Sequence, residues 1–266
     1  MPIKATDFLQ SSEDNMFSII IPSYNQGKYI GQTIESILNQ SYKNVEVLVI
    51  DGGSTDNTID VLKSYTDRIF WLSEKDRGQT HAINKGIILA KGNIIAYLNS
   101  DDFYLEKTLE NVVSAFTSHR SALWVTGDYV IVDEAGNKIQ NLIAKYKFFF
   151  RNMLSFKLLT VLNPIIQPST FLTKALIERA GLFDETLKYT MDYEYWLKAI
   201  KIQRPIIIKE SLSAFRIHTQ SKGGSQFRNQ FEEELAVARL YQKNSTLLFL
   251  HFLHNKFINI VYSIIK

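Results

Sequence analysis

Cysteine is absent from this 266-residue sequence, which excludes disulfides, thiolate nucleophiles and cysteine-ligated zinc. An apolar run is missing from the first 16 residues, where Asp7, Glu13 and Asp14 lie instead, so this segment lacks the pattern of a secretory signal. We therefore expect a cytoplasmic protein, or one attached peripherally to the inner face of the cell membrane.

A strong excess of one charge is also missing. The 30 Lys and Arg residues against 27 Asp and Glu residues give a formal net charge of +3, so the composition gives no argument for nucleic acid as a partner. The apolar segment 247–265 is interrupted near its middle by His254, Asn255 and Lys256, which disfavours a membrane-spanning helix. The 45% of hydrophobic residues is ordinary for a chain that buries a sizeable core.

Short β-branched runs alternate with segments of helical spacing in the first hundred residues. Strands are predicted at 17–22, 45–50, 69–72 and 94–98, and helices at 29–39, 57–65 and 79–90. This alternation predicts a mainly parallel sheet with helices on its faces. Sheets of this kind bind ligands at the carboxyl ends of their strands.

Four polar loops follow these strands and should meet at that edge of the sheet. They are 22–25, 51–54, 74–78 and 99–102. In the last loop the adjacent carboxylates of Asp101 and Asp102 repel each other unless a cation or hydrogen bonds hold them. A Mg²⁺ or Mn²⁺ ion shared with a nucleotide diphosphate would meet that need, whereas Asp102 can also simply cap the following helix.

Single residues of the other loops also allow a ligand. The Tyr24 ring can stack on a base, the Asp51 carboxylate can accept a hydrogen bond from a base or ribose beside Gly52, and Arg77 can meet phosphate. Taken one at a time, these residues are explained at least as well by turns, helix caps and a solvated surface.

The loops combine into motifs in a fixed order: IPSYN at 21–25, DGGSTDNT at 51–58, DRGQ at 76–79 and NSDD at 99–102. Further motifs follow in the second half: QPSTF at 167–171, GLFD at 181–184 and MDYEYW at 191–196. The whole set resembles the family-two glycosyltransferases with the GT-A fold. The later motifs resemble the acceptor-side motifs of bacterial members that build surface polysaccharides.

This resemblance implies an α/β fold of the GT-A type, with a Rossmann-like, mainly parallel sheet flanked by helices, a smaller acceptor-side region and C-terminal helices. It divides the chain into an N-terminal extension (1–16), a catalytic domain (17–225) and a C-terminal helical segment (226–266). The catalytic domain would comprise a nucleotide-binding half (17–104) and an acceptor-side half (105–225).

The resemblance also implies roles for single residues. The nucleotide, normally a uridine diphosphate, would be bound by Pro22, Tyr24, Asn25, Asp51, Gly52, Ser54, Arg77 and Asp101. Asp102 would bind Mn²⁺ or Mg²⁺, together with His218 if that histidine is more than a strand-end residue. Asn99 departs from the family's D-x-D pattern, where an acid is usual.

Two further carboxylates complete the implied site. Asp128 would contact the donor sugar, although it equally suits a turn. Asp192 would be the catalytic base that takes the proton of the acceptor hydroxyl, with an N-cap of the helix at 193–200 as its alternative role. The segment 222–225, of sequence KGGS, is expected to form a loop that closes over the donor.

The predicted function is thus an inverting, metal-dependent transfer of a sugar from a nucleotide-sugar to a hydroxyl of a growing or lipid-linked glycan. A sugar-nucleotide pyrophosphorylase is one alternative, but the loop at 23–27 lacks the basic cluster that a triphosphate needs. A non-catalytic nucleotide-sugar-binding module is another, although it should have lost Asp102 or Asp192. Segments 138–162 and 247–266 would either lie on a membrane surface or form buried helices.

Overall fold

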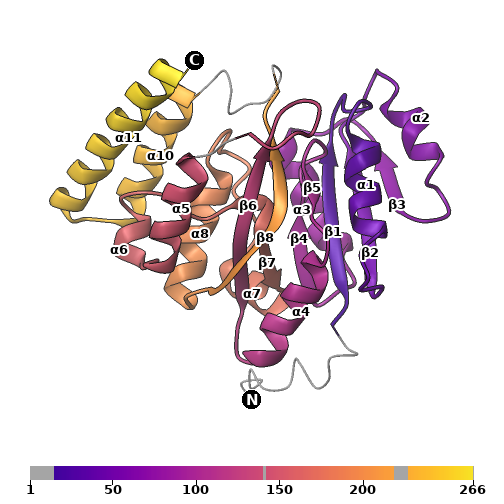
Figure 1. The fold of residues 1–266 in the computed structure, drawn as a ribbon, viewed down its shortest axis with the longest axis horizontal. Coiled ribbons are helices and arrows are strands. Elements are labelled where there is room, and N and C mark those ends of the chain that lie inside the picture. Colours follow the sequence, from indigo (N-terminus) through magenta and orange to yellow (C-terminus); the bar gives the residue numbers. More distant parts are fainter. Residues whose placement is uncertain (1–14, 140–141, 219–226, 266) are drawn as a thin grey trace.

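An eight-stranded mixed sheet forms the centre of the computed structural model, which describes residues 15–139, 142–218 and 227–265 (Figure 1). Its strands are β1 (Phe17–Ser23), β2 (Val45–Asp51), β3 (Phe70–Ser73), β4 (Ile94–Tyr97), β5 (Phe103–Tyr104), β6 (Trp124–Val132), β7 (Thr170–Thr173) and β8 (Ile206–Arg216). Their order across the sheet is β3-β2-β1-β4-β7-β6-β8-β5. The predicted loop at 222–225 and residues 1–14 of the predicted extension lie outside the described residues.

Helices cover both faces of this sheet. They are α1 (Ile30–Leu38), α2 (Thr58–Lys63), α3 (Gln79–Leu89), α4 (Thr108–Ser118), α5 (Leu142–Asn152), α6 (Phe156–Leu159), the short 3₁₀ turn η3 (Gln167–Ser169), α7 (Lys174–Ala180), α8 (Met191–Ile202), α10 (Phe227–Tyr241) and α11 (Ser245–Ile265). Successive β1 side chains point to opposite faces, as in any strand. Ile19 and Ile21 pack with α1 and α4, whereas Ile20 packs with α3, α7 and α8.

The first four strands confirm the predicted parallel half. β1 pairs in parallel with β2 and β4, and β2 pairs in parallel with β3. The carboxyl ends of these strands therefore lie at one edge, as expected from the alternation of strands and helices. The sheet continues through β7, which runs antiparallel to both β4 and β6, so the two predicted halves of the catalytic domain share one sheet.

The sequence of residues 123–137 predicts a strand followed by a hairpin turn, and the structure forms this hairpin only in part. β6 continues as one strand to Val132, and the return of the chain is a single bridge between Val132 and Lys138. A turn with Gly136 at φ +90° is closed by a hydrogen bond of 2.8 Å from the Asn137 amide to the Asp133 carboxylate. The long partner of β6 is instead β8, which pairs with it in parallel as far as Arg216.

The two C-terminal helices pack beside the sheet against α8, α5 and α6 (Figure 1). Val237 and Ala238 of α10 are buried in the same cluster as the apolar residues of α8. His251 of α11 is fully buried, and its Nδ1 lies 2.9 Å from the Thr160 carbonyl oxygen. Burial lowers the pKa of His251 to about 4, so α11 is attached through a neutral imidazole. Within the described residues, no helix combines the length and the apolar character that crossing a bilayer requires.

Candidate functional site

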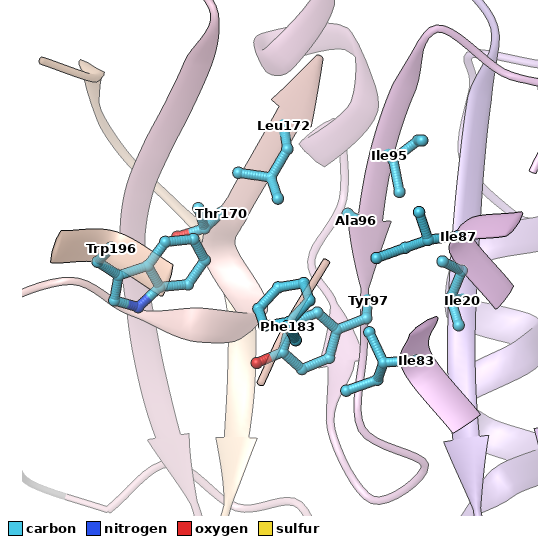
Figure 2. Close-up of a pocket in the computed structure, with 10 residues that line it drawn as sticks. All are labelled: Ile20, Ile83, Ile87, Ile95, Ala96, Tyr97, Thr170, Leu172, Phe183 and Trp196. Carbon is cyan, nitrogen blue, oxygen red and sulfur yellow. The ribbon is translucent and has the colours of Figure 1, made fainter. Parts of the chain in front are cut away.

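A cleft of about 750 Å³ opens at the carboxyl ends of β1, β2 and β4, where the four polar loops were predicted to meet. Its predicted lining residues are Pro22, Tyr24, Gly52 and Asp101, and they are joined by others from the same loops and from the end of β8. A separate void of about 10 Å³ lies in the apolar core between Ile83 and Trp196 (Figure 2). That void barely holds one water molecule, so the cleft is the site for a ligand.

The lip of the cleft carries an available aromatic ring. The Tyr24 side chain is 59% exposed, while Pro22 beside it is buried. Gly52 forms part of the wall, and a Cβ at this position would lie 2.8 Å from Asp76 Oδ2. A glycine at 52 therefore lets the loop that contains Asp76 close in on the loop after β2. The prediction that Tyr24 stacks on a base is compatible with this geometry.

Asp51 holds the loop after β2 from within. It is fully buried, and one carboxylate oxygen accepts from the backbone N–H groups of Gly53 at 3.1 Å and Ser54 at 2.9 Å. The same oxygen accepts from the Ser73 hydroxyl at 2.7 Å, and the other accepts from the Ser54 hydroxyl at 2.5 Å. Asp51 and Ser54 are not among the residues that line the cleft, in contrast to their predicted contacts with the nucleotide.

Asn25 also acts between loops. Its backbone has φ of 53°, a left-handed conformation that asparagine tolerates better than most residues. Its amide N–H donates to the Ser54 hydroxyl at 2.7 Å, and its side-chain oxygen accepts from the Thr55 N–H at 2.8 Å. These bonds join the loops after β1 and β2, so the described contacts of Asn25 shape the cleft from behind its wall.

In the loop at 74–78, the cation that lines the cleft differs from the predicted one. Arg77 is exposed and forms an ion pair with Glu185, with 2.7 Å between the guanidinium and the carboxylate. Lys75, two residues earlier in the same loop, lines the cleft instead. The sequence placed this loop correctly, but no local pattern shows which of two nearby cations points inward.

The two adjacent acids have different surroundings. Asp101 lines the cleft, and its Oδ2 lies 2.9 Å from Nε2 of His218. Asp102 is 1% exposed; its Oδ1 accepts from the Arg216 N–H at 2.9 Å and its Oδ2 accepts from the Asn99 amide at 3.2 Å. Burial raises the pKa of Asp102 well above its usual range, and the nearby charge of Asp101 adds to the effect. Of the two predicted metal ligands, Asp102 is therefore buried and not among the residues that line the cleft, whereas His218 contacts Asp101.

The donor set at this point suits a divalent cation that also binds a substrate. Within the described part of the chain, no group of three or more His, Asp or Glu residues is placed to hold a metal. Asp101 and His218 supply one carboxylate and one imidazole, and imidazole suits Mn²⁺ better than Mg²⁺. Diphosphate oxygens and water would complete such a site, as is usual where a protein contributes few ligands.

Arg216 is the central residue of the site that the sequence did not reveal. Its side chain is 2% exposed overall and lies where β8 ends. The guanidinium donates to the backbone oxygen of Asp101 at 2.8 Å, to that of Glu134 at 2.8 Å and to the side chain of Gln32 at 2.5 Å. Arg216 thereby fixes the acidic loop to β8 and α1. A lone arginine at a strand end carries no motif that would predict this role.

A chain of amide side chains explains why residue 99 is not an acid. Asn99 accepts from the Gln79 amide at 2.7 Å and donates to Asp102 and to the Gln167 side-chain oxygen, each at 3.2 Å. Gln167 in turn donates to the Tyr97 carbonyl at 2.6 Å. A carboxylate cannot donate, so an acid at 99 would oppose both Asp102 and Gln167. Asn99, where the D-x-D pattern has an acid, thus suits its neighbours Asp102 and Gln167, which both accept hydrogen bonds from it.

Asp192 lies in the first turn of α8. The helix begins at Met191 with Thr190 as its N-cap, so the alternative role of Asp192 as the N-cap is wrong. One carboxylate oxygen accepts from the Tyr193 N–H at 2.7 Å. Burial raises the pKa of Asp192 above its usual range, while that N–H and the charge of Lys147 act against the rise. A base whose pKa moves toward neutrality is better matched to proton transfer at neutral pH.

The start of α8 abuts the start of α3, which forms a wall of the cleft. The Thr80 hydroxyl lies 2.7 Å from the Met191 sulfur, and Gln79 lines the cleft directly before it. Burial raises the pKa of Tyr97 well above its usual range, and the charges of both Asp192 and Asp102 contribute. Both acids therefore lie near one buried tyrosine.

Asp128 differs most from its predicted role. Its carboxylate pairs with the guanidinium of Arg151 at 2.5 Å, and the Arg151 side chain is fully buried. Asp128 is not among the residues that line the cleft. A buried arginine needs a partner, so this ion pair accounts for the acid by fixing α5 to β6. The predicted contact with the donor sugar has no support in this geometry.

Comparisons with known proteins identify relatives of this chain. The sequence model of Glycosyl transferase family 2 matches residues 18–180. An uncharacterized glycosyltransferase of Rickettsia typhi is 30% identical over 240 residues, which cover 89% of this chain and 74% of the relative. An uncharacterized glycosyltransferase of Haemophilus influenzae is 30% identical over 227 residues, which cover 80% and 84% of the two chains.

Solved structures share the fold. S. aureus TarS 1–349 in complex with UDP-GlcNAc matches with a TM-score of 0.67 at 19% identity, over 91% of this chain and 72% of that chain. The mannosyltransferase PcManGT from Pyrobaculum calidifontis in complex with GDP-Man and Mn²⁺ matches with a TM-score of 0.66 at 18% identity, over 95% and 74%. These matches confirm the predicted α/β architecture of the GT-A type.

Proposed function

Because the chain belongs to glycosyl transferase family 2, whose members use nucleotide-sugar donors, we propose that it is an inverting enzyme that transfers a sugar from a UDP-sugar to a hydroxyl group. The acceptor would be a growing or lipid-linked glycan of a bacterial surface polysaccharide. The observation that supports this proposal is that α8, which carries Asp192 in its first turn, meets the start of α3 at the wall of the nucleotide cleft, although Asp192 itself is not among the residues that line the cleft.

In this mechanism the two sides of the site have separate tasks. Tyr24 stacks on the base at the lip of the cleft, and Lys75 neutralises part of the diphosphate charge from the wall. Asp101 and His218 would hold Mn²⁺ or Mg²⁺, which stabilises the charge that develops on the leaving diphosphate. The oxygen of the acceptor hydroxyl attacks the anomeric carbon from the face opposite the diphosphate, which leaves, so the configuration at that carbon is inverted. Asp192 takes the proton of the hydroxyl during this attack.

The structural relatives support a nucleotide-sugar donor and leave the choice of base to experiment. TarS is described with UDP-GlcNAc and PcManGT with GDP-Man and Mn²⁺. An open lip with a single exposed Tyr24 ring suits stacking against either base. The preference for uridine therefore rests on the motifs.

We expect UDP to bind at least about tenfold more tightly with Mn²⁺ than with a chelator, a difference of about 1.4 kcal/mol, because Asp101 and His218 would hold a cation that offsets the charge of the diphosphate. Isothermal titration calorimetry with UDP and, in parallel, GDP measures this. The Asp101→Asn variant should lose the metal effect, while Asp60→Asn, an exposed change on α2, should keep it. Equal UDP affinity in Mn²⁺ and in chelator would remove the metal from the mechanism, and tighter binding of GDP would replace uridine.

The same purified protein distinguishes the alternative functions. Metal-dependent hydrolysis of a nucleotide-sugar to nucleoside diphosphate and free sugar supports a transferase. Formation of nucleotide-sugar from a nucleoside triphosphate and a sugar phosphate would indicate a pyrophosphorylase. Donor binding without any turnover, in the presence of glycan acceptors, would indicate a binding module.

We propose that the side of the molecule formed by α11 and α5 lies on a membrane surface. On α11, Phe249, Phe252, Leu253, Lys256 and Phe257 recur at helical spacing, and each of the four apolar side chains is at least 39% exposed. Phe149 of α5 and Met153, the residue after α5, are also exposed, and α5 lies against α11 because Tyr146 stacks on His254. Such a face, with a lysine and no acid, suits an interfacial helix on anionic lipid.

We expect the protein to float with anionic liposomes and to float less with neutral ones. Replacing Phe249, Phe252 and Phe257 by serine should abolish flotation, because it removes the apolar face while His251 still fixes the helix. A matched variant with serine at Ile88 and Leu89, which are exposed on α3, should float like the wild type. Unchanged flotation of the α11 variant would show that this helix is not the membrane contact.

A further inference from the structure

The C-terminal helix α10 is attached to the loop that leads into α8. The Glu233 carboxylate accepts hydrogen bonds from three consecutive backbone N–H groups, those of Lys188 at 3.0 Å, Tyr189 at 2.7 Å and Thr190 at 2.9 Å. It also accepts from the Thr190 hydroxyl at 2.9 Å. One side chain of α10 thus fixes the backbone of three residues that immediately precede Met191, the first residue of α8.

The hydrogen bonds that the Glu233 carboxylate accepts are strong ones, because the carboxylate is ionised. A carboxylate offers about four lone-pair directions, and hydrogen bonds to an ionised acceptor are about twice as strong as neutral ones. Burial alone would raise the pKa of Glu233, but the backbone hydrogen bonds outweigh it and hold the pKa below its usual range. Glu233 is therefore ionised at neutral pH. Its charge lies at the positive end of the α8 dipole, which favours it further.

Besides Glu233, two other residues of α10 lie close to α8. Tyr241 contacts the helix, and Glu234 lies near Asp192. The Tyr241 hydroxyl donates to the Glu194 carboxylate, and the Lys201 ammonium lies 4.8 Å from the centre of the Tyr241 ring. The neighbour of Glu233, Glu234, is 7% exposed, and burial raises its pKa to about 7. The Lys147 charge opposes this rise and the Asp192 charge contributes to it, so Glu234 lies near both Asp192 and Lys147.

We propose that Glu233 is a positioning residue for the transfer reaction: by fixing residues 188–190 it sets the first turn of α8 and with it the direction of the Asp192 carboxylate. The segment 226–266, predicted as a separate helical segment, then forms part of the catalytic apparatus. This inference rests on the proposed role of Asp192 as the base. The residues that Glu233 contacts, Lys188, Tyr189 and Thr190, are not among those that line the nucleotide cleft, so donor affinity should not depend on Glu233.

The Glu233→Gln variant tests this role with a change of charge and little change of size. An amide has one acceptor oxygen, and its NH₂ group would oppose the backbone N–H groups. We expect kcat to fall by about 10–100-fold, since small displacements of a reacting group have effects of this order. The Kd for UDP with Mn²⁺ should stay within about twofold of the wild-type value.

Three comparisons separate positioning from plain stabilisation. Glu232→Gln, an exposed change on the same helix, should keep wild-type kcat, and Glu233→Asp should recover part of the loss because it restores the carboxylate. Hydrogen exchange of the amides at 188–190 should be faster in Glu233→Gln. Combining Glu233→Gln with Asp192→Asn should add little to the loss in Asp192→Asn alone, because both act through one group.

Several outcomes would overturn the proposal. Wild-type kcat in Glu233→Gln would do so while leaving the glycosyltransferase assignment intact, and so would a loss of kcat that is matched by a loss of UDP affinity. Full activity of Asp192→Asn would instead refute the base, and the positioning role with it. If Glu233→Gln does not fold, Thr190→Val removes a single hydroxyl from the cluster, and its kcat should fall about three- to tenfold with unchanged UDP affinity; wild-type kcat there would also refute the proposal.

Discussion

Replacing Asp192 by asparagine should lower the turnover number by about 10²–10⁴-fold, the usual contribution of a positioned general base. Asparagine has nearly the same size but cannot take the proton of the acceptor. The fold should survive, because a charge in the first turn of a helix contributes only about 0.3–1 kcal/mol. The Kd for UDP should not change, because the nucleotide cleft is built from other loops. Initial rates with saturating donor and acceptor, together with calorimetry, measure both quantities.

Asp60→Asn is the matched control for this result. Asp60 also lies in the first turn of a helix, α2, and is exposed away from the cleft. We expect its turnover and its stability to match the wild-type values. A stable Asp192→Asn protein with a near-normal transfer rate would contradict the assignment of Asp192 as the base.

Replacing Asn99 by aspartate should destabilise the protein by about 3 kcal/mol in the absence of metal. The change removes the two hydrogen bonds that Asn99 donates to Asp102 and Gln167 and places a third carboxylate beside Asp101 and Asp102. For a chain of this size the melting temperature should fall by roughly 6–12 °C. Adding Mn²⁺ should recover part of the loss, because a cation offsets the repulsion between clustered carboxylates. Thermal unfolding in chelator and in Mn²⁺ measures both effects.

Asn57→Asp provides the comparison for a simple change of amide to acid. Asn57 is exposed at the N-cap of α2, where asparagine and aspartate are nearly equivalent. Its melting temperature should therefore match that of the wild type in both conditions. If Asn99→Asp were as stable as the wild type in chelator, the chain of amides from Gln79 to Gln167 would not be what keeps residue 99 uncharged.

Local patterns predicted the parallel half of the fold almost completely. The β-branched runs at 17–22 and 45–50 became β1 and β2 because such side chains pack on both faces of a covered sheet. The same reasoning placed the four loops at one edge, since parallel strands end on the same side. The predicted hairpin near 129–137 shows the limit of local patterns, because β8, distant in sequence, is the long partner of β6.

The direction of individual side chains could not be predicted in the same way. Asp101 and Asp102 are adjacent in sequence, and only the position of Arg216 and His218 decides which carboxylate faces the cleft and which is buried. Lys75 lines the cleft in place of Arg77, because Glu185 binds the arginine from the acceptor side. The contacts of Glu233 join residues that are more than forty positions apart, a separation at which a sequence carries no periodic signal.

The dependence of α8 on α10 has a consequence for the biosynthesis of the protein. Chains emerge from the ribosome with the N-terminal end first, so the loops after β1, β2 and β4 appear long before Glu233 does. If Glu233 fixes the base, a nascent chain acquires the parts that recognise the nucleotide early and the ability to transfer sugar only when α10 docks. A chain released before α10 is made would then lack transferase activity, because no Glu233 fixes the residues before α8. This loss would add to any general loss of stability.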